Sequence, residues 1–345
     1  MAPGAARAGI ALSLAPGIGR VRFRELLDAD GEHEAAFARA VPEGRRDALL
    51  DEADALIEQA HGCGSAVMVY GLSPYPPRLH ELPDPPTVLF VDGHDEWLDG
   101  GPVVGIVGTR AATAYGERVT REIAAQLARA GALVVSGMAR GIDGAAHRGA
   151  LGAGGRSGAV LGTGIDIAYP AAHRSLHAEL RERGVVVTEQ PPGEKATGGS
   201  FPERNRIIAA LSDLVIVIEA GRKSGALITA ARALELGRVV AAVPGPIDSP
   251  QSAGSNELLR DGAQLIASAE DALALLGLTM PARAPAADVS GVERVVWDAL
   301  SRGALDLDTL ASHTALPARE VMAAVTRLEL SGSVECALTG EVRRR

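Results

Sequence analysis

Strand-like and helix-like segments alternate from residue 103 to about residue 276, and this alternation constrains the fold more than any other feature. Short β-branched apolar runs predict buried strands at Val103–Val107, Ala132–Ser136, Ser157–Leu161, Val185–Thr188, Leu214–Ile218, Val239–Val243 and, more weakly, Gln264–Ile266. Helical patterns follow at about 115–130, 143–152, 174–183, 203–211, 225–236 and 255–260. This order predicts a doubly wound, mostly parallel α/β sheet, whose ligands bind beyond the carboxyl ends of the strands.

Further segments surround this sheet. Two short strands within 66–91, joined by a proline-rich connector, precede the alternating region. The predicted parts are a helical domain at 1–65, an extended Rossmann-like domain at 66–276, a linker at 277–290 and a winged-helix-like domain at 291–345.

The two terminal domains each leave two interpretations open. Pro16-Gly-Ile-Gly19 before a predicted helix is similar to a helix-hairpin-helix turn, and a plain helical packing domain is the alternative. The predicted recognition helix of the winged-helix domain carries only Arg319 and Arg327 as cations. Because reading DNA usually needs several phosphate contacts, a packing or partner-binding role is at least as well supported there.

Composition restricts the partners and the compartment of such a chain. The net charge of −9 argues against a protein that coats nucleic acid by bulk positive charge, but it leaves room for a local basic groove. Cys63 and Cys336 lie far apart without CxxC spacing, so neither a disulfide framework nor a zinc site is expected. No stretch has the length and apolarity of a membrane span or of a secretion signal, so we expect a cytoplasmic protein.

Glycines, hydroxyl side chains and cations recur where the predicted strands end. Glycines expose backbone N–H groups, and helix N-termini carry partial positive charge. Several phosphate sites are therefore expected along one edge of the sheet, which suits a polyanion better than a single nucleotide. The alternative is that the glycines form ordinary tight turns and the arginines are solvated or paired with acids. The segments are Gly105–Arg110, Ser136–Gly144, Gly162–Pro170, Gly221–Gly225 and Pro244–Pro246.

Two common nucleotide-binding motifs are absent from this edge. Gly162-Thr-Gly164 is not followed by the third glycine of a dinucleotide fingerprint. Arg222 occupies the position of the glycine that precedes the lysine of a P-loop. We therefore expect neither a dinucleotide cofactor nor an ATPase site of that type.

Two acid or histidine pairs receive structural interpretations. Asp143 and His147 stand four residues apart on one helical face, so an acid–base or ligand pair is one interpretation. The favoured interpretation is that Asp143 caps the helix and His147 makes a structural hydrogen bond. His173 and His177 are expected on a solvated helix face, because no third metal ligand is apparent. No catalytic residue, metal site or cofactor is predicted.

A series of motifs in fixed order resembles one protein family. The motifs include Tyr75-Pro76, Val107–Arg110, Ser136–Asp143, Leu161–Gly164, Phe201–Ile208, Lys223–Gly225 and Pro244-Gly245. They cover about residues 70 to 266, and together they resemble the DNA processing protein A family (DprA, also called Smf). The chain departs from the family pattern at Thr109, where the family has serine, and at His173, where it usually has asparagine.

The resemblance implies a function and an assembly. It implies a protein that binds single-stranded DNA, protects incoming DNA and loads RecA recombinase onto it during natural transformation. It also implies a Rossmann-like domain that forms a homodimer, and DNA binding without nucleotide hydrolysis. The last point agrees with the missing P-loop and dinucleotide motifs.

The predicted nucleic-acid site combines cations with backbone and hydroxyl donors. The cations are expected to neutralise phosphates, and the other residues to donate hydrogen bonds to phosphate oxygens. Phe201 and Tyr169 are candidates for base stacking, although burial in the core is the expected fate of both. The full set is Gly108, Thr109, Arg110, Ser136, Gly137, Arg140, Gly162, Gly164, Arg204, Asn205, Arg206, Lys223, Ser224 and Gly225.

Two other functions compete with this one. The first is nucleotide-phosphate hydrolysis of the lysine-decarboxylase-like (LOG) group, whose PGGxGTxxE pattern is not matched at Pro244–Ile247. The second is an adaptor whose terminal domains carry the activity. A mononucleotide turnover assay tests the first, and domain deletions test the second.

Overall fold

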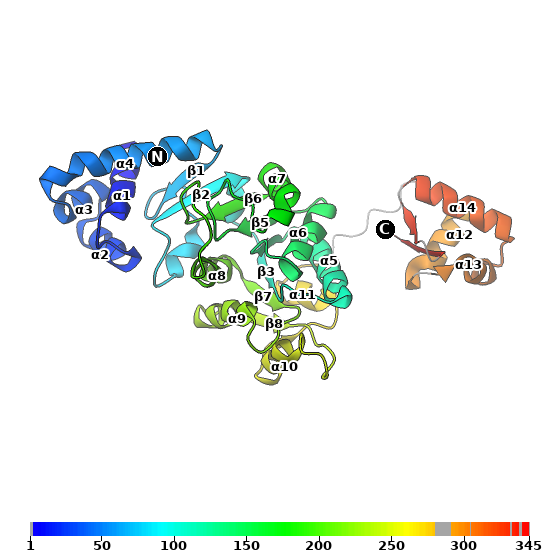
Figure 1. Cartoon of the computed structure of the whole chain (residues 1–345). Coiled ribbons are helices and arrows are strands. Elements are labelled where there is room, and N and C mark those ends of the chain that lie inside the picture. Colours follow the sequence, from blue (N-terminus) through cyan, green and yellow to red (C-terminus); the bar gives the residue numbers. More distant parts are fainter. Residues whose placement is uncertain (1–2, 280–290, 304, 332, 338–339, 345) are drawn as a thin grey trace. The chain divides into compact units, whose positions relative to one another are not determined.

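The computed structural model describes residues 3–279, 291–303, 305–331, 333–337 and 340–344. The chain divides into two compact units, residues 1–280 and residues 281–345 (Figure 1). From residue 280 onward, the predicted linker at 277–290 lies outside the described residues. Within the described ranges, no helix has the length and apolarity needed to cross a membrane.

A nine-stranded sheet forms the centre of the first unit. In chain order its strands are β1 (Ala66–Val69), β2 (Val88–Gly93), β3 (Val103–Val107), β4 (Leu133–Ser136), β5 (Ser157–Val160), β6 (Val185–Thr188), β7 (Leu214–Val217), β8 (Val239–Ala242) and β9 (Gln264–Leu265). In space they run β1-β2-β6-β5-β4-β3-β7-β8-β9. The β1–β2 and β2–β6 pairs are antiparallel and the others parallel, which confirms the predicted mostly parallel sheet.

Helices cover both faces of this sheet. They are α5 (Ala114–Arg129), α6 (Ile142–Gly152), α7 (Arg174–Arg183), α8 (Ser200–Leu211), α9 (Gly225–Glu235), α10 (Ala253–Arg260) and α11 (Ala269–Leu275). Val104 and Ile106 of β3 pack in a core with α5, α6 and α11. Val103 and Val107 belong to the core that contains α8 and α9. Successive strand residues point to opposite faces, so one apolar run fills two cores.

Four helices precede the sheet: α1 (Pro3–Leu14), α2 (Arg20–Asp30), α3 (His33–Ala40) and α4 (Glu43–Gly62). Their buried side chains, such as Leu12 and Phe23, join the same core as Val69 of β1. His33 Nε2 lies 2.8 Å from the carbonyl oxygen of Tyr70. The helical character of the N-terminal segment is confirmed. Its boundary at residue 65 stays a prediction.

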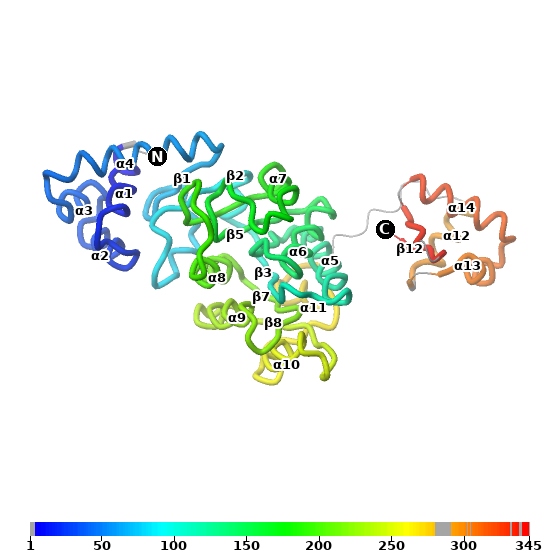
Figure 2. Tube along the Cα trace, in the orientation of Figure 1, coloured from blue at the N-terminus to red at the C-terminus, as the bar shows by residue number. Residues whose placement is uncertain are grey.

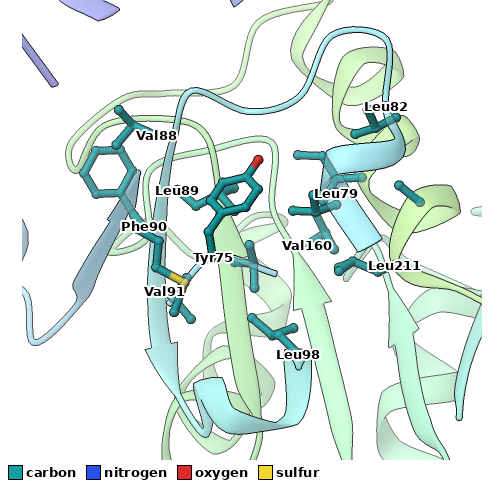
Figure 3. Close-up of a cluster of buried hydrophobic side chains, with 14 of the residues drawn as sticks. Tyr75, Leu79, Leu82, Val88, Leu89, Phe90, Val91, Leu98, Val160 and Leu211 are labelled. Carbon is teal, nitrogen blue, oxygen red and sulfur yellow. The ribbon is translucent and has the colours of Figure 1, made fainter. Parts of the chain in front are cut away.

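The proline-rich connector packs against α8, in the core that contains that helix. It contains the short helix η1 (Pro77–Glu81), and η2 (Asp95–Leu98) follows β2. Figure 3 shows Tyr75, Leu79 and Leu98 in one buried cluster with Leu89. The Tyr75 hydroxyl donates to the carbonyl oxygen of Pro86 at 2.7 Å, so this buried polar group is satisfied.

The second unit is the expected winged helix. It contains α12 (Gly291–Ala299), α13 (Leu307–Thr314) and α14 (Ala318–Leu330), with β10 (Leu305–Asp306), β11 (Val334–Cys336) and β12 (Glu341–Arg344) in the order β10-β12-β11. Leu310, Val321 and Val342 belong to a core of its own. Arg327 of α14 pairs with Glu293 of α12, which leaves this helix with little free positive charge.

Most observed elements match the prediction, and two corrections are needed. The helix α8 begins at Ser200, three residues before its predicted start at 203. His173 and His177 are buried instead of lying on a solvated face. Their ring nitrogens lie 3.0 Å from the carbonyl oxygens of Met138 and Ile165, and these partners make burial of the imidazoles tolerable.

Candidate nucleic-acid interface

A cavity of about 720 Å³ opens beyond the carboxyl ends of β3 and β7. The strand order reverses between these two strands, which is where ligands of open α/β sheets bind. The loop after β3, the first half of α8 and the start of α9 form its wall. Eight predicted site residues line it: Gly108, Thr109, Arg110, Arg204, Asn205, Lys223, Ser224 and Gly225.

One side of α8 faces this cavity. Phe201, Asn205 and Ile208 follow one another at intervals of four and three residues, which places them on one helical face, and all three line the cavity. Asn205 Nδ2 donates to the carbonyl oxygen of Gly225 at 3.3 Å. This bond ties α8 to the start of α9, which runs beside it (Figure 2).

Arg110, Phe201 and Tyr169 form a stack of planar groups, which we call the aromatic stack. The guanidinium carbon of Arg110 lies 5.1 Å from the centroid of the Phe201 ring. The Phe201 and Tyr169 centroids are also 5.1 Å apart, with 35° between the ring planes. Tyr169 is 45% exposed and Phe201 is partly exposed, so the expected burial of both rings is wrong. Exposed planar groups of this kind are surfaces on which bases stack.

The start of α9 adds positive charge to the same cavity. Lys223 is exposed and forms no ion pair with any described residue. Ser224 is the N-cap of α9, and its hydroxyl oxygen accepts from the backbone N–H of Ala226 at 3.3 Å. A free ammonium group beside a helix N-terminus attracts anions.

Six predicted residues lie outside the cavity. They are Ser136, Gly137, Arg140, Gly162, Gly164 and Arg206. Ser136 is fully buried, and its hydroxyl donates to the carbonyl oxygen of Ile106 at 2.6 Å, so it is not a phosphate donor. Gly162 serves close packing, because a Cβ there would lie 3.1 Å from the Phe201 ring. Gly137 likewise packs against the Arg204 guanidinium.

The guanidinium of Arg204 is committed to the protein. The residue is 5% exposed, and Nη1 donates to the carbonyl oxygens of Gly137, at 2.7 Å, and of Val160. Burial lowers the pKa of Arg204 to about 10, and the nearby Asp143 carboxylate opposes this shift. The expected phosphate contact is therefore corrected: Arg204 joins the ends of β4 and β5 beneath the cavity.

Arg206 is not free for a ligand either. Its side chain is 7% exposed, with Nη2 2.5 Å from Glu189 Oε1 and Nε 3.3 Å from Asp84 Oδ2. Burial raises the pKa of Glu189, and the neighbouring arginines oppose that shift. The role predicted for Arg206 at the phosphates is corrected to a structural ion pair.

Asp143 and His147 hold structural positions on α6. Asp143 Oδ2 accepts from the backbone N–H groups of Gly137, at 3.2 Å, and Ala139, at 3.4 Å. The carboxylate thus stabilises the loop after β4. The expectation that Asp143 caps the helix is therefore wrong. His147 is fully buried with Nδ1 2.8 Å from Ser157 Oγ, which confirms its structural hydrogen bond.

Acid should destabilise the protein through His147. Burial lowers the pKa of His147 from 6.5 to about 3, so the unfolded chain takes up a proton at higher pH than the folded one. The stability present above pH 6.5 is therefore lost progressively as the pH falls from 6.5 towards 3, by about 2 kcal/mol at pH 5. His147→Gln should flatten this part of the dependence in urea unfolding at pH 7 and pH 5. An identical pH dependence in both proteins would contradict the expectation.

The Glu219 carboxylate lies at the N-terminus of α5 and was not predicted as a site residue. Glu219 is 4% exposed, and its carboxylate accepts from the backbone N–H of Thr113 at 2.9 Å and from its hydroxyl at 2.5 Å. In nucleotide-binding Rossmann-like proteins a phosphate lies at such a helix N-terminus. An acidic residue directly after a buried strand was the available signal.

Metal ligation has no candidate among the residues that the structure describes. Within those ranges, no three histidine, cysteine, aspartate or glutamate side chains lie close enough together to hold an ion.

Comparisons with known proteins agree with this geometry. A family model described as DNA recombination-mediator protein A matches residues 66–277, and one described as the DprA winged helix domain matches residues 280–337. A DNA processing protein DprA of Mycobacterium tuberculosis is 45% identical over 260 residues, which are 73% of this chain and 67% of the relative.

Two solved structures are similar to this chain. DprA of Streptococcus pneumoniae shares 34% identity and a TM-score of 0.65, over 78% of this chain and 95% of that one. DNA processing protein A of Helicobacter pylori, described for its unique single-stranded DNA binding mode, shares 31% identity and a TM-score of 0.56, over 62% of this chain and 97% of that one. With its α/β core and winged helix both matched, the chain belongs to the DNA recombination-mediator protein A family, the DprA and Smf proteins.

Proposed function

We propose that this protein binds single-stranded DNA in the cavity beyond β3 and β7. The observation that carries the proposal is the aromatic stack of Arg110, Phe201 and Tyr169, which shares one edge of the sheet with the free ammonium group of Lys223. A single strand exposes both the faces of its bases and its phosphates, whereas in a duplex the base faces are covered by the neighbouring base pairs. The Helicobacter pylori structure, described for single-stranded DNA binding, supports the same assignment.

We further infer a mediator role without enzymatic turnover. In this role the protein protects incoming DNA and loads RecA recombinase onto it in natural transformation, in the cytoplasm and as a homodimer. The description of the matched family as a recombination mediator supports the mediator role. The edge strand β9, where Leu265 is 55% exposed, offers a sheet edge that a second copy can cover, and this supports the homodimer.

Hydrolysis of nucleotide phosphates is the less favoured function. Glu219 places a negative charge at the N-terminus of α5, where a nucleotide phosphate would have to bind. The Glu219 carboxylate and a phosphate bound at this helix N-terminus would both be negatively charged and would repel each other. We therefore expect no turnover of mononucleotides.

Fluorescence anisotropy with labelled oligo-dT tests the proposal. The titration is run without nucleotide, across a series of salt concentrations, and with a matched duplex as competitor. We expect tight binding that falls steeply with salt and prefers the single strand. Absence of binding at low salt would refute the assignment.

Lys223→Ala should weaken oligo-dT binding and reduce the slope of log K against log salt by about 0.7, the share of one phosphate contact on a single strand. Arg129→Ala is the matched control, because Arg129 is exposed at the far end of α5 and does not line the cavity. If both variants kept the wild-type slope, Lys223 would not contact a phosphate.

A further inference from the structure

We propose that Arg20, in the N-terminal helices, is a positioning residue for the single-stranded DNA site; the inference rests on the proposed function. Arg20 is the first residue of α2, and its side chain is 31% exposed. Its guanidinium reaches three carboxylates at once: Nη2 lies 2.9 Å from Glu203 Oε2, Nε 3.2 Å from Glu189 Oε1 and Nη1 3.3 Å from Asp84 Oδ2.

Two of these carboxylates also bind Arg206 of α8. Glu189 Oε1 lies 2.5 Å from Arg206 Nη2, and Asp84 Oδ2 lies 3.3 Å from Arg206 Nε. The same two oxygen atoms therefore serve both arginines. We call this five-residue network, Arg20, Asp84, Glu189, Glu203 and Arg206, the α8 clamp. It connects α2, the proline-rich connector, the segment after β6 and the helix α8.

The clamp and the DNA site use different sides of the same helix. Glu203 and Arg206 are three residues apart and share the side of α8 that meets the clamp. Phe201 and Asn205 are four residues apart and share the side that lines the cavity. Because a helix moves as a unit, the clamp sets the position of the Phe201 ring against Arg110.

Arg20 supplies half of the positive charge in the clamp. Without it, three carboxylates face the single guanidinium of Arg206, and two of the three already share that partner. Uncompensated charge in a partly buried cluster is unfavourable. A shift of α8 that carries Glu203 away from Glu189 and Asp84 would relieve the repulsion, at the expense of the aromatic stack.

The salt dependence of DNA binding separates positioning from direct contact. The Arg20 guanidinium already forms ion pairs with three carboxylates, so we expect that its removal eliminates no phosphate contact. Arg20→Ala should weaken oligo-dT binding about five-fold and leave the salt slope at the wild-type value. This differs from Lys223→Ala, for which the slope itself decreases.

Two further variants complete the experiment, with the melting temperature of each variant measured in parallel. Arg22→Ala is the matched control, because Arg22 is exposed on the same helix. Among the residues that the structure describes it pairs with Glu25 alone, three residues along the helix, so wild-type affinity is expected. Arg20→Lys keeps the charge but loses the planar fork that bridges three carboxylates, so intermediate affinity is expected. If Arg20→Ala fails to fold, Arg20→Lys still tests the positioning role.

Two outcomes would overturn the positioning role. One is wild-type affinity in both Arg20 variants, and the other is a reduced salt slope, which would make Arg20 a phosphate contact. Failure of the wild-type protein itself to bind oligo-dT would instead refute the proposed function.

Discussion

Replacing Phe201 with alanine should lower the affinity for oligo-dT about thirty-fold, because stacking of one base on an aromatic ring contributes about 2 kcal/mol. The ring of Phe201 lies between Arg110 and Tyr169, at 5.1 Å from each. Its loss removes a stacking surface and also the support that holds the Arg110 guanidinium in place. Anisotropy titrations at one fixed salt concentration measure the change.

Two control variants make this result specific. Phe201→Tyr keeps the ring and should bind with nearly wild-type affinity. Tyr115→Ala removes another exposed aromatic side chain, 43% exposed, that lies outside the cavity lining, and it should also bind normally. Equal losses in Tyr115→Ala and Phe201→Ala would show that the aromatic stack has no special part in binding.

Replacing Arg204 with alanine should lower the free energy of unfolding by about 3 kcal/mol, as expected when one partner of a buried charge pair is removed. The carbonyl oxygens of Gly137 and Val160 would lose their donor. Asp143, which is 6% exposed, would lose the positive charge that most strongly opposes the rise of its pKa on burial. Urea unfolding monitored by circular dichroism measures the effect.

Arg222→Ala is the control for Arg204→Ala. Arg222 is exposed in the loop before α9, so the change in unfolding free energy should stay within about 0.5 kcal/mol. Because Arg204 and Asp143 interact, the double variant Arg204→Ala/Asp143→Ala should be less destabilised than the sum of the two single variants. Wild-type stability in Arg204→Ala, together with a reduced salt slope, would restore the original assignment of Arg204 to a phosphate.

The local pattern of the chain was sufficient to predict most of the fold. The run Leu214–Ile218 is apolar at every position and β-branched from Val215 onward, a pattern that is typical of a strand buried on both faces. The observed strand β7, Leu214–Val217, differs from that prediction by one residue. The alternation of strands and helices also predicts the edge of the sheet at which the ligand site forms, because the carboxyl ends of parallel strands all lie at one edge.

The candidate site was predicted less completely than the fold. Arg110 and Lys223 are exposed cations at the cavity, as the glycine-rich turns indicated. Arg204 and Arg206 belong to the same short arginine-rich segment, yet both are buried and bound to other parts of the protein. Composition alone cannot separate these two pairs, because all four residues carry the same charge in similar local surroundings.

Four features could thus be predicted from the sequence: the order of strands and helices, the mostly parallel sheet, the winged helix and the sheet edge at which the candidate site lies. These features depend on periodicity and turn chemistry over a few residues. Which cations remain free and which rings stack became apparent only in the folded chain. Burial and ion pairing join residues that are distant in the chain, such as Arg20 and Glu203, which are 183 positions apart, and no local pattern encodes such a contact.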